Sequence, residues 1–184
     1  MACVHAQDRD LSRYTKCELG PEFEIVEVDG PVTDFAWETP TKSGKTSINV
    51  ETGYRVLVSY RKTEPFGNLK AERLPAASYQ DEKAKLLSSL GNFAADSGMD
   101  GKVSTPTMNS FQLYGVNRSK LEGGVLSIYN LFNDADHVTV TMYLLNDHPD
   151  TRKFRTLEQY AKVRDAFLRS YTACVKKNDT SAGH

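Results

Sequence analysis

Acidic and imidazole side chains gather at two points where the chain is expected to reverse. Asp134, Asp136 and His137 form one cluster, and residues 147–150 (Asp-His-Pro-Asp) form the other. Carboxylate oxygens and a neutral imidazole bind cations, and an imidazole also serves as a base near neutral pH. Asp and Asn are also common at turns because they bond the local backbone. We therefore interpret Asp134, Asp136 and His137 as ligand or cation contacts at most, with turn formation as the simpler alternative.

The sequence lacks the established catalytic and metal-binding patterns. His137 and His148 are eleven residues apart, about 30 Å or more of extended chain, so they do not share a metal. Gly44-Lys45-Thr46 lacks the earlier glycine of a phosphate-binding loop, because that position is Thr39. No Gly-x-Ser-x-Gly elbow, dinucleotide fingerprint or interleaved Cys and His spacing occurs. The sequence predicts no catalytic residue, no metal and no cofactor.

Tyrosines recur on segments with strand-like alternation: Tyr54, Tyr60, Tyr114, Tyr129 and Tyr143. An aromatic sheet face binds sugars, peptides or bases. Sheet propensity and core packing explain the same pattern. Tyr129 and Tyr143 are the two that we add to the candidate ligand contacts.

The cysteines bear on the cellular compartment. Residues 1–6 resemble the end of a secretory signal, with cleavage expected before Gln7. Loss of that segment leaves Cys17 and Cys174, and an even pair in an exported chain predicts a disulfide. One alternative makes Cys3 the lipidated residue of a lipoprotein, which adds a membrane tether. Another is an ordinary cytosolic N-terminus.

Composition describes an ordinary globular chain. It has 184 residues, 39% apolar and 26% charged, which favours one domain with a core of its own. A net charge of -1 argues against a general nucleic-acid surface. No apolar run approaches the roughly 20 residues of a transmembrane helix. The glycosylation acceptor pattern occurs at Asn117 and Asn178 and matters only in a eukaryotic secretory chain.

The candidate residues are positioned by an expected hairpin. Val125–Leu145 contains two segments of period two around a turn at 133–136, as in a pair of antiparallel strands. In the rest of the chain, Gly and Pro mark the expected turns, and the spacing of the apolar residues predicts a helix or a strand between them. The expected segments are strands at 23–28 and 33–38, a turn at 29–31, a strand from Tyr54, a connection over 62–77, a helix from Ser78 to about 97, strands at 103–108 and 111–116, and a helix over 157–174.

This order predicts an α+β fold: a mainly antiparallel sheet of about six or seven strands with a mid-chain helix and a long C-terminal helix packed on it. We expect an N-terminal segment over 1–21, one domain over 22–175 and a flexible tail over 176–184. The order of elements from Phe23 to Cys174 resembles the Mog1/PsbP-like α/β sandwich family. That resemblance implies a non-enzymatic binding or accessory protein.

Three hypotheses for function follow. The first is an exported, non-catalytic binding or accessory domain, periplasmic or secreted, for an unknown protein or small-molecule ligand. The second is a small hydrolase whose site combines the 62–77 connection with the Asp134–His137 turn. The third is a structural protein that self-associates through an exposed sheet edge. A pocket in which His137 meets a hydroxyl and a second titratable group favours the enzyme, and an aromatic groove favours binding.

Overall fold

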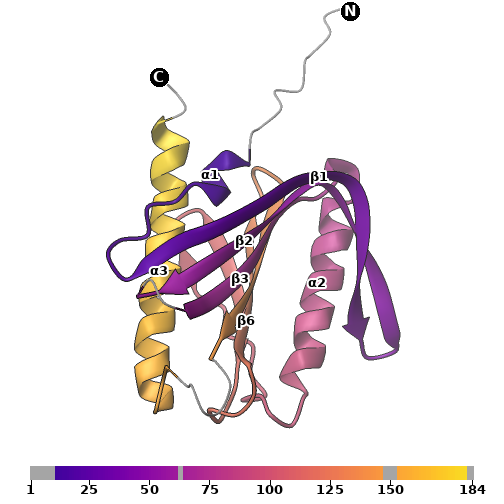
Figure 1. Cartoon of the computed structure of the whole chain (residues 1–184). Coiled ribbons are helices and arrows are strands. Elements are labelled where there is room, and N and C mark those ends of the chain that lie inside the picture. Colours follow the sequence, from indigo (N-terminus) through magenta and orange to yellow (C-terminus); the bar gives the residue numbers. More distant parts are fainter. Residues whose placement is uncertain (1–10, 62–63, 147–152, 182–184) are drawn as a thin grey trace, which may run out of the picture.

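A computed structural model describes residues 11–61, 64–146 and 153–181 (Figure 1). Two long helices lie on either side of one sheet. The elements in chain order are α1 (Ser12–Thr15), β1 (Phe23–Thr41), β2 (Gly44–Tyr60), β3 (Glu64–Arg73), the 3-10 turn η1 (Ala76–Ser78), α2 (Tyr79–Ala94), β4 (Thr107–Met108), β5 (Phe111–Asn117), β6 (Val125–Asn133), β7 (Val138–Leu145) and α3 (Leu157–Ser181).

The described strands form one antiparallel sheet in the order β1-β2-β3-β7-β6-β5-β4. The expected hairpin is its middle: β6 pairs with β7 from Val125↔Leu145 to Asn133↔Val138. The seven-stranded sheet with a mid-chain and a C-terminal helix confirms the predicted fold class.

Both faces of the sheet are covered, one by α3 and the other by α2 (Figure 1). On β6, Tyr129 and Leu131 pack in the core that contains the α3 residues. Ile128 and Phe132 point to the opposite side and pack with α2 residues. Strands covered on both sides are apolar on both faces, which explains why β6 carries large apolar groups at odd and even positions.

Aromatic rings fill the space between α3 and the sheet. Phe167 of α3 lies 5.2 Å from Phe23 and 5.4 Å from Phe66, between ring centroids. Phe154 and Tyr160 extend the cluster, with their centroids 5.4 Å apart. All five rings are buried. Offset and edge-to-face contacts of this kind add to the burial of apolar area, so this face holds most of the core.

The β1–β2 hairpin is long and bent, and its outer part passes over α2 (Figure 1). Thr39 Oγ1 lies 2.5 Å from Ser89 Oγ of α2. Our prediction of two strands separated by a turn at 29–31 was wrong, because β1 stays paired with β2 from Phe23 to Thr41. The register slips between Asp29 and Val32 instead, where Gly30 has a φ of 124°. Such a bulge bends a strand without ending it.

The prediction of a connection over residues 62–77 was also wrong for most of that range. Residues 64–73 form β3, which is hydrogen-bonded to β2 and β7 on its two sides. Leu69 and Ala71 are fully buried on the α3 side, and Lys70 and Glu72 alternate with them. Pro65 stands near the start of the strand, a position where proline is tolerated. The pattern of period two was present but was interrupted by Gly67 and by charged residues.

The other predicted element boundaries differ less from those in the structure. The strand expected over 103–108 is reduced to Thr107–Met108 with an isolated bridge at Ser104. Ser78 precedes α2 without a side-chain capping bond. Thr156 caps α3, since its Oγ1 accepts a 3.1 Å bond from the Gln159 amide. The α3 helix continues to Ser181, beyond the expected start of the tail at residue 176.

Candidate functional site

A cavity of about 280 Å³ lies where β1 bends across β2 and β3. We call it the Trp37 cavity. Its described lining residues are Asp29, Val32, Phe35, Trp37, Gly53, Tyr54, Arg55, Lys70 and Glu72. They combine aromatic rings with two carboxylates and two cations, the mixture that is typical of sites for small organic molecules.

Close packing of the strands forms this cavity. Gly53 pairs with Glu72 across β2 and β3. A Cβ at Gly53 would lie 2.9 Å from Phe35 Cζ and 3.3 Å from Glu72 Cγ. The missing side chain therefore leaves room for the Phe35 ring beside the Glu72 side chain. A larger residue at position 53 would push both groups into the hollow.

Glu72 is the most unusual group of the cavity. It is 3% exposed, and its Oε2 accepts a 3.2 Å hydrogen bond from Trp37 Nε1. Burial raises the pKa of this carboxyl to about 7, against the lowering effects of the Lys70 charge and the Trp37 bond. A carboxylate that is removed from water and lacks a full set of hydrogen-bond donors is more stable in its protonated form. Glu72 therefore changes charge close to neutral pH.

Lys70 lies beside it. Its ammonium Nζ is 3.8 Å from the centroid of the Trp37 ring, a close cation-π contact. Burial lowers the pKa of Lys70, while the Glu72 charge acts to raise it and Arg55 adds to the lowering. Lys70 does not form an ion pair with Glu72 among the described contacts, although both side chains lie on the same face of β3.

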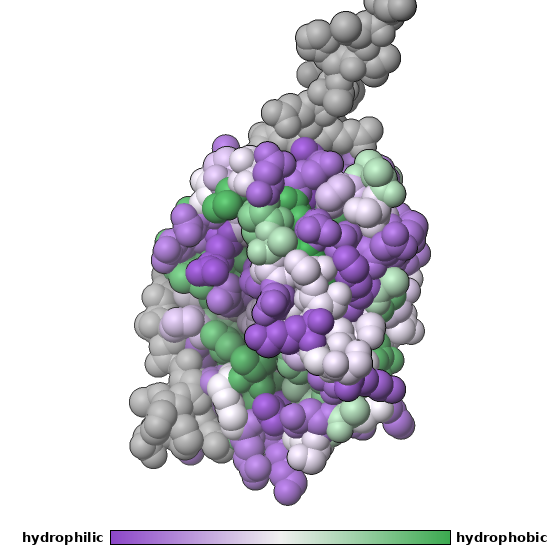
Figure 2. Space-filling view, turned by 90° about the vertical axis from the view of Figure 1, so that its right-hand side faces the viewer, coloured by the Kyte–Doolittle hydropathy of each residue, from purple (hydrophilic) through white to green (hydrophobic). Residues whose placement is uncertain are grey.

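Tyr143 extends this surface toward α2. Burial raises the pKa of its hydroxyl, and the Glu72 charge adds to the effect. Tyr143 and Trp37 both line a second, much smaller hollow of about 10 Å³ between the hairpin, α2, β6 and β7. Figure 2 shows the side with α2 and the outer hairpin, where hydrophilic residues separate the apolar ones into small groups.

The lining combines charged and aromatic groups. Among the described residues around the Trp37 cavity there is no Ser, Thr, Cys or His, but Lys70, Glu72 and Tyr54 carry groups that also act as acids, bases or nucleophiles in other proteins. The cavity offers a buried carboxylate, an ammonium and ring faces, which recognise charge and shape.

The candidate contacts at the β6–β7 turn are engaged with protein groups. Asp134 accepts bonds from Lys83 Nζ at 2.8 Å and from the Tyr79 hydroxyl at 2.7 Å. Burial acts to raise the pKa of Asp134, but these two hydrogen bonds, together with the charges of Lys83 and His137, outweigh it and lower the pKa. Asp134 therefore anchors α2 to the turn.

Asp136 ties the same turn to the N-terminal segment. Its carboxylate contacts the Arg13 guanidinium and accepts bonds from Tyr14 Oη at 3.0 Å and Asn133 Nδ2 at 2.6 Å. His137 has a φ of 55°, and its carbonyl accepts a 2.9 Å bond from the Leu74 amide. These contacts are structural, and ligand binding at the turn stays a prediction.

The two candidate tyrosines lie on opposite faces. Tyr129 is 3% exposed in the core under α3, and its hydroxyl donates to Asn117 Oδ1 at 3.3 Å. Tyr143 packs with residues on the α2 side. The structure therefore does not bring Tyr129 to Tyr143, and only Tyr143 lies near the Trp37 cavity.

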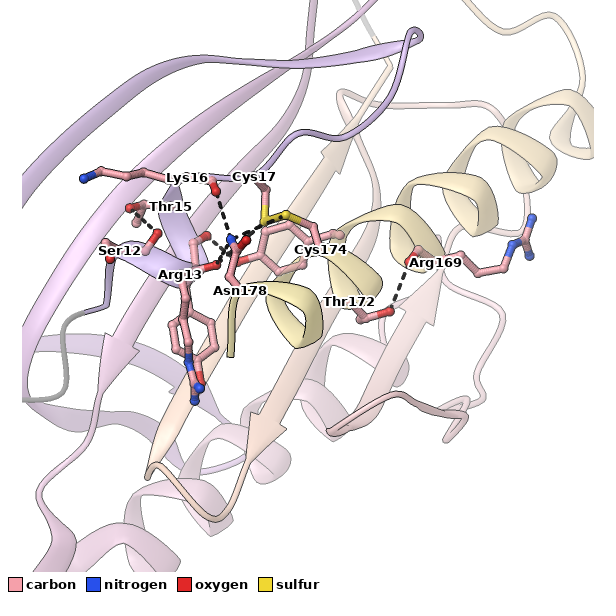
Figure 3. The surroundings of a disulfide bond; sticks show 11 residues. Ser12, Arg13, Thr15, Lys16, Cys17, Arg169, Thr172, Cys174 and Asn178 are labelled. Atoms are coloured by element: carbon pink, nitrogen blue, oxygen red, sulfur yellow. Dashed lines mark hydrogen bonds between the residues drawn. A yellow bond between two sulfur atoms is a disulfide. The ribbon is translucent and has the colours of Figure 1, made fainter. Parts of the chain in front are cut away.

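Cys17 and Cys174 form the predicted disulfide, with their Cα atoms 5.7 Å apart (Figure 3). Asn178 lies next to it and donates from Nδ2 to the carbonyls of Lys16 at 3.0 Å and Arg13 at 3.3 Å. Since a glycan attaches to this nitrogen, the contacts oppose modification of Asn178. The segment around α1 is packed, because Tyr14 is 1% exposed.

Asn117 belongs to a polar cluster between α3 and the sheet. Its Oδ1 accepts bonds from Ser127 Oγ at 2.7 Å and from Arg164 NH1 at 2.8 Å. Arg164 also pairs with the carboxylate of Asp165 at 2.8 Å. Tyr160 completes the cluster through a 2.6 Å bond to Ser127.

Several sequence-based hypotheses lie outside the described residues: Cys3 as a signal remnant or lipidation site, and the cluster at 147–150. A hollow of about 430 Å³ lies between β2 and α3, and at its rim Arg61 pairs with Glu22 at 3.5 Å. In the part of the chain that is described, no group of His, Cys, Asp and Glu side chains is arranged to hold a metal.

Sequence reasoning missed Trp37, Lys70 and Glu72. The signal for β3 existed, since Leu69 and Ala71 alternate with Lys70 and Glu72. Nothing local marks the approach of Glu72 to Trp37, which is 35 residues away in the chain.

The helices in the described ranges include none that is long and apolar enough to cross a bilayer. Comparisons with protein-family models, with curated proteins and with solved structures found no match to this chain.

Proposed function

We propose that this chain is an exported, non-catalytic binding domain whose small organic ligand occupies the Trp37 cavity. Glu72 carries this proposal. A carboxylate that is 3% exposed at the edge of a 280 Å³ cavity costs folding free energy. Residues that lower stability in this way concentrate at sites of function. The Trp37 and Phe35 rings supply apolar walls beside that charge.

Two further observations support export and binding. A disulfide between Cys17 and Cys174 persists in oxidising compartments and is rare in the reducing cytosol. The order of strands and helices is the feature that resembles the Mog1/PsbP-like family, whose members are mostly binding or accessory proteins. We therefore expect a periplasmic or secreted protein.

The binding test uses Trp37 as the reporter, because it is the single tryptophan of the chain. Its indole N–H gives one resonance in a nitrogen-proton correlation spectrum. We expect this resonance to shift and saturate on addition of at least one member of a panel of amines, carboxylic acids, sugars, nucleosides and short peptides. If no member shifts it at millimolar concentration, the proposal fails.

A steric variant locates the binding. Gly53→Leu places side-chain atoms where Phe35 and Glu72 now lie, so it should abolish saturation while the rest of the spectrum stays dispersed. Ser47→Ala is the matched control, because Ser47 is an exposed position on the same strand. A ligand that binds the Gly53→Leu variant unchanged binds elsewhere, which contradicts the assignment.

The hydrolase alternative has less support. His137 does approach a hydroxyl and a carboxylate, since its ring is 5.0 Å from Tyr79 and Tyr79 donates to Asp134. Burial raises the pKa of that hydroxyl, and Asp134 raises it further. A hydroxyl with a raised pKa is a poor nucleophile. Lys83 also neutralises Asp134, so the carboxylate is paired with a cation of the protein, and the His137 imidazole is the base that lies beside the hydroxyl.

Self-association is the second candidate. β1 is an edge strand of the sheet, and Val26, Val28 and Val32 are 56%, 44% and 53% exposed. An exposed apolar edge is a template for pairing with another chain. Light scattering tests this directly. A dimer mass that returns to the monomer mass in Val28→Lys supports self-association, and a monomer at all concentrations rejects it.

Export is tested on the protein from its native source. We expect the intact mass to lack residues 1–6, and alkylation without reductant to leave Cys17 and Cys174 unmodified. An added lipid mass on Cys3 identifies a lipoprotein and keeps export. A full-length chain with both cysteines alkylated contradicts it.

A further inference from the structure

Glu72 is an incompletely paired charge. Trp37 Nε1 is the one hydrogen-bond donor that contacts its carboxylate among the described residues, and the nearby Lys70 acts on it through its charge without an ion pair. A buried carboxylate is stable in its charged form when a cation and further donors reach it. The protein supplies one donor, so the carboxylate is able to accept further hydrogen bonds or a positive charge from a bound molecule.

The Trp37 ring already accepts an ammonium group. Lys70 Nζ lies 3.8 Å from its centroid. Aromatic faces attract cations because their electron density lies above and below the ring. Lys70 is a single point charge on a flexible four-carbon stem, so it is able to withdraw toward solvent when another cation arrives. The ring and the carboxylate together present two attractive groups to one positive nitrogen.

We propose that the Trp37 cavity binds organic cations, with the positive nitrogen of the ligand between the Trp37 ring and the Glu72 carboxylate and its apolar part against Phe35. This inference rests on the proposed binding function and specifies its ligand class. Lys70 Nζ lies against the Trp37 ring and therefore competes with the ligand for it. The cavity volume of about 280 Å³ limits the ligand to a small molecule or one side chain of a peptide.

The test uses three probes of similar size: choline, its uncharged isostere 3,3-dimethylbutan-1-ol, and acetate. Choline carries a permanent charge, so its own ionisation does not change with pH. We expect choline to shift the Trp37 indole resonance and saturate at about pH 8.5. The alcohol should bind at least tenfold more weakly, because it lacks the charge, and acetate should not bind.

The pH dependence identifies the partner of the ligand. Since the Glu72 pKa is raised to about 7, the choline Kd should increase by about 30-fold between roughly pH 8.5 and 5.5 as the carboxyl takes up its proton. Asp29 on β1, Arg55 on β2, Lys70 on β3 and Tyr143 on β7 also face this region. Variants are therefore needed to separate their charges from that of Glu72.

Two variants make that separation. Glu72→Gln should weaken choline binding at least tenfold at high pH and abolish the pH dependence, while its spectrum and thermal melt show that it stays folded. Lys70→Gln should bind choline equally or more tightly, because the internal competitor is gone, and should keep the pH dependence. Unchanged choline binding by Glu72→Gln overturns the inference.

Other outcomes are distinct from failure of the proposed function. Equal binding of the alcohol and choline shows an apolar site, and binding of acetate in place of choline shows an anion site. Each overturns the organic-cation inference and leaves a binding domain. If the three probes and the wider panel all leave the indole resonance unchanged, the inference and the proposed function fail together.

Discussion

The two faces of the sheet differ in what fills them. Under α3, the rings of Phe23, Phe66 and Phe167 pack together, and a disulfide joins the helix to the segment that carries α1. On the α2 side, the strands β1 to β3 present Glu72 and Lys70 beside a partly buried indole.

This difference indicates which face of the sheet contributes most to the stability of the fold. Burial of apolar rings is favourable in proportion to area, whereas a buried carboxylate opposes folding. We infer that the α3 face holds the fold together and that the α2 face is specialised for binding. Four predictions test this comparison.

The largest effect is expected from the disulfide on the α3 side. The bond joins residues 157 positions apart, and replacing both cysteines by Ser should lower the free energy of unfolding by about 4–5 kcal/mol, because the unfolded chain regains its freedom. Urea denaturation measures this, with the reduced wild-type protein as the control. A loss below about 1 kcal/mol would show that the closed loop contributes little.

The next prediction compares an aromatic ring on α3 with one on α2. Phe167 is fully buried, so Phe167→Ala should cost about 3–5 kcal/mol of unfolding free energy. Phe93 on α2 is partly buried at the edge of its core, and Phe93→Ala should cost roughly 1 kcal/mol. Denaturant titrations of the two variants are directly comparable. Equal losses would refute the assignment of stability to the α3 face.

Glu72→Gln should increase stability. Because the folded-state pKa is raised from 4.5 to about 7, the folded protein holds this proton more tightly than the unfolded chain, and wild-type stability falls as pH rises through that interval. The variant lacks this loss and should gain about 3 kcal/mol above neutral pH and nothing near pH 4. Thermal melts across this range test it. Glu51→Gln, at an exposed position on β2, is the control and should show no such gain.

The smallest effect is expected at the surface of the outer hairpin. Lys45 and Glu38 form a 3.1 Å ion pair in which both side chains are mostly exposed. Lys45→Ala should change the unfolding free energy by about 0.5 kcal/mol or less, because water and salt screen the pair. A larger loss in a denaturant titration would show that the outer hairpin contributes to stability more than its contacts suggest.

The fold was predictable where one segment contained its own signal. The β6–β7 hairpin has two arms of period two and a polar turn, and the last helix has a capping residue and an apolar stripe. The disulfide was predictable because two cysteines remain after Cys3 is set aside. β3 was missed because Gly67 and Pro65 interrupt its alternation, and charged Lys70 and Glu72 suggest exposure in an isolated strand.

The candidate site was not predictable for a different reason. Trp37 and Glu72 meet because a bulge bends β1 across β2 and β3, and Gly53 leaves room for the Phe35 ring beside the Glu72 side chain. Neither segment alone specifies that approach. Conversely, Asp134 and Asp136 were visible as a cluster in the sequence, yet their partners Lys83 and Arg13 come from distant segments. A local cluster of acids does not indicate whether cations of the protein already occupy it.

The cysteine bridge also has a mechanical consequence. Residues near α1 lie beside the C-terminal end of α3 (Figure 1), and Arg13 contacts Asp179 across this junction. Tension applied between the two ends of the chain would therefore pass through the covalent link from Cys17 to Cys174, and the strands and α2 would lie outside the path of the load. An oxidised molecule would transmit tension without loading the strands that form the Trp37 cavity, and in a reduced one the load would pass into the rest of the fold.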